Sequence, residues 1–128
     1  MKVLTVKNPW ADWIIFSRNG EYKETENRTW ETMYRGRIMI HVSKELDRYA
    51  AAKFNATPEK YARWREQAGK IIGTVDLYAI DREIITDWDE PGLFHWRFKS
   101  PRPLEKAIAI RGALGLWNYE VQNDWIYL

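Results

Sequence analysis

The most polar stretch of the sequence is 23–28, which reads Lys-Glu-Thr-Glu-Asn-Arg. In an extended segment alternate side chains share a face, so Glu26 and Arg28 would point one way and Lys23 the other. Held near one pocket, these three residues would provide a positive charge for a phosphate or a base oxygen, an acceptor for a base amine, and a planar guanidinium for a guanine edge. Alternatively, the same residues could form a ladder of ion pairs on the surface, with no binding role and little contribution to stability.

Other groups that could do chemistry are few. The chain has no cysteine, which excludes a thiol nucleophile, a disulfide and a zinc knuckle. Its two histidines, His41 and His95, fall in strand-like segments where packing is the expected role. Lys23 beside a hydroxyl, Thr25 or Ser43, is the one candidate hydrolytic pair. Because the sequence lacks metal-ligand spacings and a phosphate-binding glycine loop, we expect no metal and no cofactor.

Length and composition indicate one domain over residues 1–128. No apolar run approaches the roughly 18 residues of a membrane span, and the N-terminal segment lacks the hydrophobic region of a signal peptide. A chain without cysteine is also typical of a reducing compartment. We therefore expect a cytoplasmic protein that has no membrane partner.

Charge is distributed unevenly along the chain. The net charge is +2, yet one arginine stands against five acidic residues in 81–90, and five basic residues stand against one acidic residue in 97–111. A basic stretch interleaved with aromatic residues is typical of phosphate binding, although a solvated strand face can show the same pattern. The small net charge therefore does not exclude an anionic partner.

Short strands and helices would position these residues. The strand-like segments are 1–6, 37–42, 70–80, 93–98, 104–110 and 124–128. The expected helices are one that begins at Asn8-Pro9 and ends at Asn19-Gly20, one capped by Ser43 that runs to Phe54, and one from Thr57-Pro58 to about Gln67. Gly73 indicates a bulge or a close backbone approach within a strand. The order of elements predicts an α+β fold with a mixed, partly closed sheet of about six strands, from which the helices in 44–68 are an excursion.

From the first strand to Trp117 the sequence resembles the ASCH domain family of the PUA-like superfamily. The matching motifs are Pro-Trp-Ala at 9–11, Gly20 followed by Lys-x-x-Glu-Asn-Arg-Thr-Trp at 23–30, Tyr-Arg-Gly at 34–36, Ile-His-Val-Ser-Lys at 40–44, Gly-Lys-Ile-Ile-Gly-Thr-Val at 69–75, Trp96, Arg-Pro-Leu at 102–104, Arg-Gly at 111–112 and Gly-Leu-Trp at 115–117. The resemblance implies a small β-barrel with helices over it, and a cleft between helix and barrel that receives RNA or a nucleobase.

The resemblance also implies which residues border that cleft. The Gly-Lys-Glu-Arg motif of the family lies there, so Lys23, Glu26 and Arg28 carry over at matching positions. Family segments that contain Trp10, Ser43 and Arg111 border the same cleft. This sequence departs from the family pattern because two residues, rather than one, separate the glycine from the lysine.

Three functions follow from these observations. The first is a module that binds single-stranded RNA, another nucleic acid or a modified nucleoside. A base would stack on Trp10, Trp30 or Trp117, its edge would be read by Glu26 and Lys23, and its phosphate would be held by Arg28 and the stretch 97–111. Of the other tryptophans, Trp13, Trp64 and Trp125 are expected in the core, and Trp88 and Trp96 have no predicted role.

The second function is a hydrolase in which Lys23 is the base and Glu26 or Arg28 stabilises the developing charge. Some ASCH-like proteins remove the acetyl group of N4-acetylcytidine with a lysine and a threonine three residues later, but Glu26 stands at that position here. Another member type resembles a metal-independent ribonuclease for single-stranded RNA. The third function is a protein-interaction adaptor that presents aromatic side chains of the helical excursion, namely Tyr49, Phe54, Tyr61 and Trp64.

Overall fold

The computed structural model describes residues 1–120 and 125–128. Within these residues the chain forms one six-stranded sheet and three short helices. In chain order the elements are β1 (Lys2–Val6), α1 (Trp10–Ile15), β2 (Thr25–Arg28), β3 (Gly36–Val42), α2 (Arg48–Lys53), α3 (Pro58–Gln67), β4 (Lys70–Asp81), β5 (Phe94–Ala109) and β6 (Leu116–Asn118). The strand order is β2-β5-β4-β3-β1-β6. β1 and β3 are parallel and the other neighbours are antiparallel, so the sheet is mixed.

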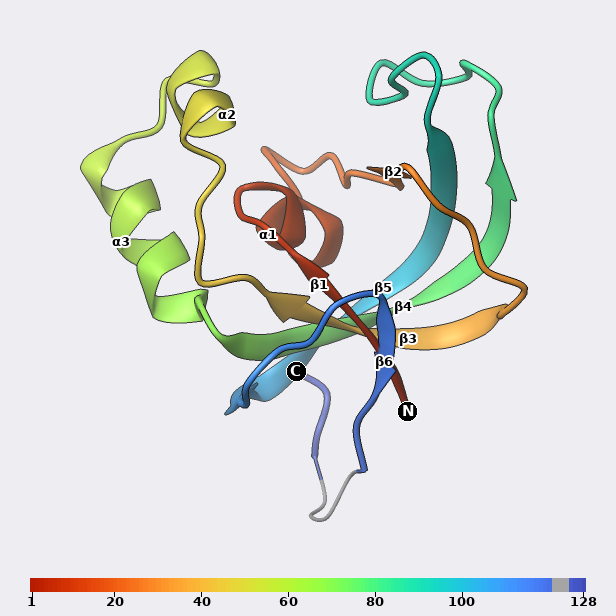
Figure 1. The fold of residues 1–128 in the computed structure, drawn as a ribbon. Coiled ribbons are helices and arrows are strands. Elements are labelled where there is room, and N and C mark those ends of the chain that lie inside the picture. Colours follow the sequence, from red (N-terminus) through yellow and green to blue (C-terminus); the bar gives the residue numbers. More distant parts are fainter. Residues whose placement is uncertain (121–124) are drawn as a thin grey trace.

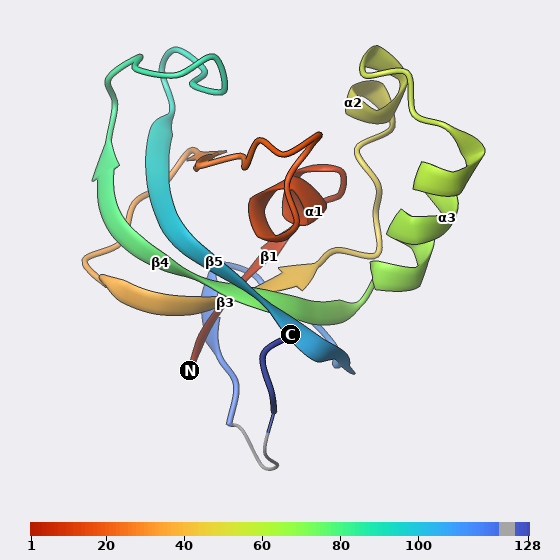
Figure 2. The ribbon, with the colours of Figure 1, turned by 180° about the vertical axis from the view of Figure 1, so that it is seen from behind.

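The sheet curls strongly into a half-barrel around α1 (Figure 1). Seen from behind, α2 and α3 lie beside the half-barrel, and the loop between β4 and β5 rises on the opposite side (Figure 2). This arrangement confirms the predicted α+β class with a mixed, partly closed sheet and accompanying helices.

The main hydrophobic core fills the space between α1 and the sheet. Ala11, Ile14 and Ile15 of α1 are buried there against side chains of β1, β3, β4 and β5. The helix lies so close to β4 that a Cβ atom on Gly73 would be 2.6 Å from Cγ2 of Ile15 and 2.8 Å from the backbone oxygen of Arg102. The strand register also shifts at this position, so the glycine predicted to mark a bulge or a close approach marks both.

A buried polar network ties α1 to α3. The carboxylate of Asp12 accepts hydrogen bonds from Arg63 (Nε, 3.0 Å), Trp64 (Nε1, 3.1 Å) and Gln67 (Nε2, 2.9 Å). Asn8 donates to Oε1 of Gln67 at 2.8 Å and accepts the backbone N–H of Asp12 at 2.9 Å. The N-cap residue of α1 is Pro9, and not Asn8 as predicted from the sequence, because the helix begins one residue later, at Trp10. These contacts fix the position of α1, from which one wall of the candidate site projects.

α1 is shorter than the sequence predicts. The chain leaves the helical conformation at Ser17, whose φ angle is 79°. Asn19 and Gly20, with φ angles of 50° and 85°, form a tight turn closed by two backbone hydrogen bonds between Arg18 and Glu21. The Asn-Gly pair, interpreted from the sequence as a helix end, is therefore a turn between two short extended segments.

The second helix also begins later than predicted. Asp47, and not Ser43, caps α2, because Oδ1 of Asp47 accepts the backbone N–H of Ala50 at 3.0 Å. The hydroxyl of Ser43 instead accepts the N–H of Glu45 in the loop after β3. α3 matches its prediction, with Thr57 as the cap. None of the described helices is long and apolar enough to cross a membrane.

β5 is one strand of 16 residues where the sequence predicts two, at 93–98 and 104–110. Pro101 and Pro103 suggest a break, and Ser100 does have a positive φ angle of 53°. The strand continues because β4 pairs with it along nearly its whole length, with shifts in register. β2 covers the other edge of β5 only at its first residues, so prolines are tolerated further along.

β2 and β6 are strands that the sequence analysis did not identify. Both are short, and each is stabilised by pairing with a strand distant in sequence. The predicted last strand, 124–128, is reduced in the described residues to a bridge between Leu104 and Tyr127 with two flanking backbone hydrogen bonds, and Asp124 lies outside those residues.

Candidate functional site

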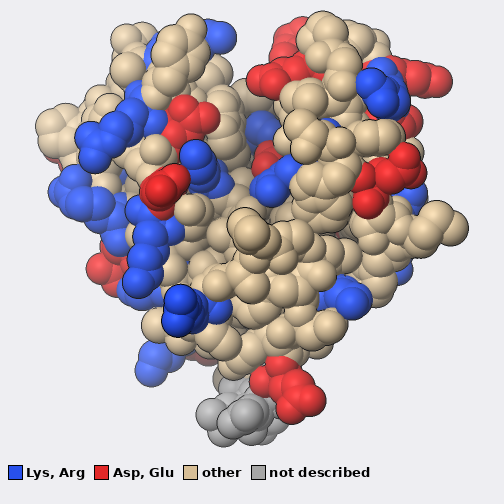
Figure 3. Space-filling view, viewed as in Figure 1, with Lys and Arg blue, Asp and Glu red and all other residues tan. Residues whose placement is uncertain are grey.

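A groove with two adjoining hollows opens beside α1. The first, about 660 Å³, lies between α2 and the β4–β5 loop. The second, about 540 Å³, lies between β2 and the segments that follow β1 and β3. Trp10, Glu26 and Asn27 line both hollows, so the two meet at these residues. Figure 3 shows the surface hollowed between a side rich in Lys and Arg over α2 and α3 and a side rich in Asp and Glu at the loop.

Glu26 lies at the junction of the two hollows and is 7% exposed. Its Oε1 is 3.3 Å from Nζ of Lys23, and its Oε2 accepts from Nε and Nη2 of Arg28 at 3.1 and 2.9 Å. Nη2 of Arg28 also donates to the backbone oxygen of Thr5 at 2.8 Å. Because Thr5 belongs to β1, this arginine connects the edge strand β2 to the opposite part of the curled sheet.

Lys23 lies ahead of β2, so the alternation predicted for an extended segment does not separate it from Glu26. Its side chain is only 4% exposed, and Nζ donates to the backbone oxygen of Thr25 and to Glu26. Nζ also lies 5.3 Å from the ring centroid of Trp10 and 5.8 Å from that of Trp88. Burial lowers the pKa of Lys23, and the nearby carboxylate of Glu26 only partly opposes this effect.

Aromatic rings form the walls of the first hollow. Trp10 is oriented by a hydrogen bond from its Nε1 to Oδ2 of Asp47 at 3.0 Å. The ring of Trp88, from the β4–β5 loop, lies with its centroid 6.1 Å from that of Trp10 at an interplanar angle of 77°. Phe54, the C-cap residue of α2, packs edge-on against Trp10. Because the rings are not parallel, a planar ligand would stack on one of them rather than be enclosed between two.

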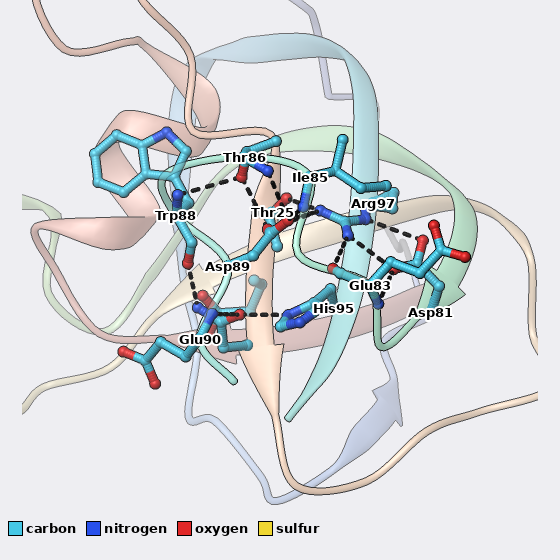
Figure 4. A network of polar contacts seen from close by, with 12 residues as sticks. Thr25, Asp81, Glu83, Ile85, Thr86, Trp88, Asp89, Glu90, His95 and Arg97 are labelled. Carbon is cyan, nitrogen blue, oxygen red and sulfur yellow. Dashed lines mark hydrogen bonds and ion pairs between the residues drawn. The ribbon is translucent and has the colours of Figure 1, made fainter. Parts of the chain in front are cut away.

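A buried arginine shapes the loop that carries Trp88 (Figure 4). Arg97 donates to Asp81 and to Asp89, each at 2.7 Å at the closest, and to the hydroxyl of Thr25 and the backbone oxygen of Glu83 at 2.9 Å. All five N–H groups of the guanidinium can be assigned to these acceptors. We call Arg97, Asp81 and Asp89 the closed cluster.

Asp89 is the residue around which the loop folds. Oδ2 accepts the backbone N–H groups of Ile85 and Thr86, both at 2.8 Å, and Oδ1 accepts the hydroxyl of Thr86. Burial opposes ionisation of this carboxyl, but the hydrogen bonds from Arg97 and the loop outweigh it and hold the pKa of Asp89 far below its usual range. The hydrogen bond from Arg97 likewise lowers the pKa of Asp81.

A second set of contacts holds the loop from the β2 side. Asn27 donates through Nδ2 to the backbone oxygen of Trp88 at 2.8 Å, and its Oδ1 accepts the N–H of Glu90. Nδ1 of His95 is 2.7 Å from the same Oδ1 and is therefore the donor. His95 is fully buried, and its Nε2 has no hydrogen-bond partner among the described residues. The orientation of Asn27, and with it the position of Trp88, is thus set by three contacts.

Six of the eight residues predicted for the site lie along the groove: Lys23, Glu26 and Arg28, with Trp10, Trp30 and Ser43. Arg111 and Trp117 are not among the lining residues. Trp117 packs against a separate hydrophobic cluster, with Nε1 donating to the hydroxyl of Thr5 at 3.1 Å. No residue of 97–111 lines either hollow, and Arg97 is already occupied by the closed cluster, so this basic stretch is not part of the groove.

The candidate hydrolytic pairs are not assembled. The hydroxyl of Thr25 is fully buried and accepts from Arg97, on the side of β2 away from Glu26. Ser43 lines the second hollow, whereas Lys23 lines the first. The sequence analysis gave no role to Asn27, Trp88 and Asp89, and it assigned Arg97 to a phosphate-binding stretch, whereas Arg97 belongs to the closed cluster. The only sequence signal for the closed cluster is the group of acidic residues in 81–90 that precedes the basic stretch 97–111.

The groove combines a desolvated amine, a carboxylate held by a guanidinium, and aromatic walls. Such a set can accept and donate hydrogen bonds to a planar heterocycle, and the amine can act as a base or a nucleophile. In residues 1–120 and 125–128, no three His, Cys, Asp or Glu side chains gather as metal ligands. The sequence matches no protein-family model and no curated protein with which it was compared.

Proposed function

We propose that the groove binds one nucleobase, presented by single-stranded RNA or by a modified nucleoside, and that the chain is an ASCH-domain protein of the PUA-like superfamily. One observation carries the functional proposal: Glu26 is held between Lys23 and Arg28 at the meeting point of two hollows lined by tryptophan. The family proposal rests on the sequence motifs, three of which, at 9–11, 23–30 and 40–44, contribute residues to the groove.

Each group has a role in this proposal. A base stacks on Trp10 or Trp88, and one such contact contributes about 1 to 3 kcal/mol. Oε1 of Glu26 accepts from an exocyclic amine. In its protonated form Lys23 has a third N–H on Nζ, beyond those used by Thr25 and Glu26, and this N–H donates to a ring nitrogen or oxygen. Arg28 uses Nε and Nη2 for its contacts to Glu26 and Thr5, which leaves the N–H groups of Nη1 for a phosphate next to the second hollow.

The charge of the first hollow favours a base over a phosphate there. Its lining includes five carboxylates and only three basic side chains, Arg18, Lys23 and Lys53. In the second hollow two basic residues, Lys7 and Arg28, balance Glu26 and Glu45. A polyanionic strand running through the first hollow would be repelled. We therefore place the base in the first hollow and any phosphate beside Arg28.

Tryptophan fluorescence provides the test. We expect pyrimidine and purine nucleosides and a short single-stranded RNA to quench it, and the RNA signal to weaken with salt more than the nucleoside signal does. Glu26→Gln should reduce the affinity. The control is Glu66→Gln, which should not, because Glu66 is an exposed residue of α3 that pairs with Lys70 of β4. The absence of quenching at low salt by every nucleoside and oligonucleotide would refute the proposal.

The lowered pKa of Lys23 favours the hydrolase as a second candidate. Neutral Lys23 would take a proton from water, which attacks N4-acetylcytidine or an RNA phosphodiester while Arg28 stabilises the developing charge. The absence of a usable hydroxyl beside Lys23 argues for water and not a Lys–Thr pair. Incubation with each substrate in chelator should show turnover that Lys23→Ala abolishes. Turnover that persists in this variant would remove Lys23 from the mechanism.

The adaptor is the least supported of the three functions. Trp64 is 3% exposed, and Phe54 and Tyr61 pack with it and with Trp13 in one hydrophobic cluster. Of the four aromatic residues in the helical excursion, only Tyr49 is mostly exposed, at 79%. The helices therefore use their aromatic side chains to pack against the rest of the chain.

A further inference from the structure

Lys23 is a buried lysine whose amine borders the first hollow, and a surface lysine could make the same hydrogen bonds without being buried. A lysine side chain is seldom buried, yet that of Lys23 is 4% exposed and lines a hollow of about 660 Å³. Among the described residues, Nζ has two acceptors, the backbone oxygen of Thr25 and Oε1 of Glu26. A neutral amine has two N–H groups and one lone pair. The two acceptors match the two N–H groups, so the lone pair occupies a remaining tetrahedral position on Nζ.

We propose that Lys23 is a covalent capture site, which forms an imine with an uncharged aldehyde carried on a planar ring, of the kind found in a formylated pyrimidine nucleoside. The inference rests on the proposed function, because the groove that binds a nucleobase would bring the aldehyde to Nζ. Burial lowers the pKa of Lys23 and so increases the fraction of the nucleophilic, neutral form.

Imine formation needs a nucleophile and a group that carries protons, and the groove supplies both. The lone pair of Nζ adds to the aldehyde carbon, and the C=O π electrons move to the oxygen. The carboxylate of Glu26, 3.3 Å away, takes a proton from the nitrogen and returns it to that oxygen. The carbinolamine then loses its hydroxyl and the second N–H proton as water, and the C=N bond forms. Amine and aldehyde give imine and water, with no change in oxidation state.

Glu26 is positioned for this relay by Arg28. The guanidinium binds Oε2 through two contacts, which leaves Oε1 directed to Lys23. The rings of Trp10 and Trp88, each within 6 Å of Nζ, provide apolar surface for the ring that bears the aldehyde. The five carboxylates in the lining repel an anionic aldehyde, so the preferred ligand is uncharged.

Reductive trapping tests the proposal. The whole protein is incubated with 5-formyluridine and sodium cyanoborohydride near neutral pH, and the modified lysines are identified by peptide mass spectrometry. We expect most of the label on Lys23, little on Lys53, which lines the same hollow but is exposed, and slower labelling by pyridoxal 5′-phosphate. Excess uridine should protect Lys23. Label spread over exposed lysines with no excess on Lys23 would overturn the proposal.

Two variants separate this role from a structural one. Lys23→Met should lose the specific label while retaining the circular dichroism of the fold. Because the carboxylate of Glu26 raises the pKa of Lys23, Glu26→Gln should move the pH midpoint of labelling downward, and Glu66→Gln should not. A midpoint that stays at the ordinary lysine value in both the natural protein and Glu26→Gln would contradict the inference, even if Lys23→Met failed to fold.

The two proposals can fail independently. Quenching by uridine without a trapped adduct would refute covalent capture and leave nucleobase binding intact. Specific labelling of Lys23 by benzaldehyde, without quenching or protection by any nucleoside, would refute nucleobase binding and retain the reactive amine.

Discussion

Two buried charge clusters lie on opposite sides of β2 and are built from the same kinds of residue. In the closed cluster, Arg97 donates to Asp81, to Asp89, to the hydroxyl of Thr25 and to one backbone oxygen, so its donors are satisfied within the chain. On the other side, Glu26 lies between Lys23 and Arg28 and borders both hollows. We call the latter the open cluster.

The difference between the clusters identifies which charges are available to a ligand. Thr25 and Glu26 are consecutive residues, yet the first faces Arg97 and the second faces the groove, because side chains alternate along a strand. The closed cluster lowers the pKa of its carboxyls and stabilises a loop. The open cluster includes a lysine whose pKa is lowered by burial. Burying its ammonium group costs free energy, and a purely structural site would avoid that cost.

Loss of the central carboxylate of the closed cluster should have the largest effect. Asp89→Ala leaves Arg97 without one buried partner and the N–H groups of Ile85 and Thr86 without an acceptor. We expect the free energy of unfolding to fall by about 3 kcal/mol. Urea denaturation measures this change. The control is Asp87→Asn at an exposed position in the same loop, which should change the free energy of unfolding by no more than about 0.5 kcal/mol.

The free energy of unfolding of an open-cluster variant tests whether the two clusters differ in role. Glu26→Gln retains the shape of the side chain and should reduce stability less than Asp89→Ala does. Equal losses of stability in the two variants would mean that both clusters are structural, and the interpretation of the groove as a ligand site would lose its physical basis.

Removal of the Trp88 ring should separate the loop's function from its stability. Trp88 is half-buried at the edge of the first hollow, whereas Asp89 behind it is buried. Trp88→Leu should reduce the affinity for nucleosides by about 1 to 3 kcal/mol through lost stacking, with a smaller change in unfolding free energy than in Asp89→Ala. Fluorescence titration of the remaining tryptophans measures the affinity. Unchanged affinity would assign stacking to Trp10 alone.

The sequence predicts the elements that depend on local pattern and misses those that depend on distant contacts. β1, β3 and α3 follow from alternation or from the Thr57-Pro58 helix start. β2 and β6 have only a few residues each, and their pairing partners are remote in the sequence. The residues of the groove on 23–30 could be predicted because they are consecutive. Trp88 and Asp89 could not, since nothing local indicates that a loop 60 residues later returns to β2 through Asn27.

The two clusters should respond to pH in opposite ranges. The carboxyls of Asp81 and Asp89 have lowered pKa values in the folded state, so their contribution is complete above the ordinary value of 3.8 and is lost as the pH falls below it. The pKa of Lys23 is lowered from 10.5, so the unfolded chain binds more protons just below pH 10.5 and the contribution of Lys23 to stability rises with pH there.

Lys23→Met isolates the alkaline effect. The unfolding free energy of the natural protein should increase relative to that of this variant as the pH rises toward 10.5. Urea denaturation at several pH values provides the comparison. A flat difference for Lys23→Met would show that its ammonium group is not penalised by burial.

The smallest expected effect concerns the carboxylates on the loop side of the first hollow. Asp87 and Glu90 are exposed, so Asp87→Asn combined with Glu90→Gln should leave stability unchanged. If repulsion by these residues keeps phosphates out of the first hollow, the double variant should bind single-stranded RNA about two- to threefold more tightly at low salt, because an exposed charge contributes only about 0.2 to 1 kcal/mol. The gain should disappear at high salt, and nucleoside affinity should not change. An equal gain for nucleoside and RNA would point to altered packing of Trp88 and not to charge, and the separation of base and phosphate between the two hollows would then be wrong.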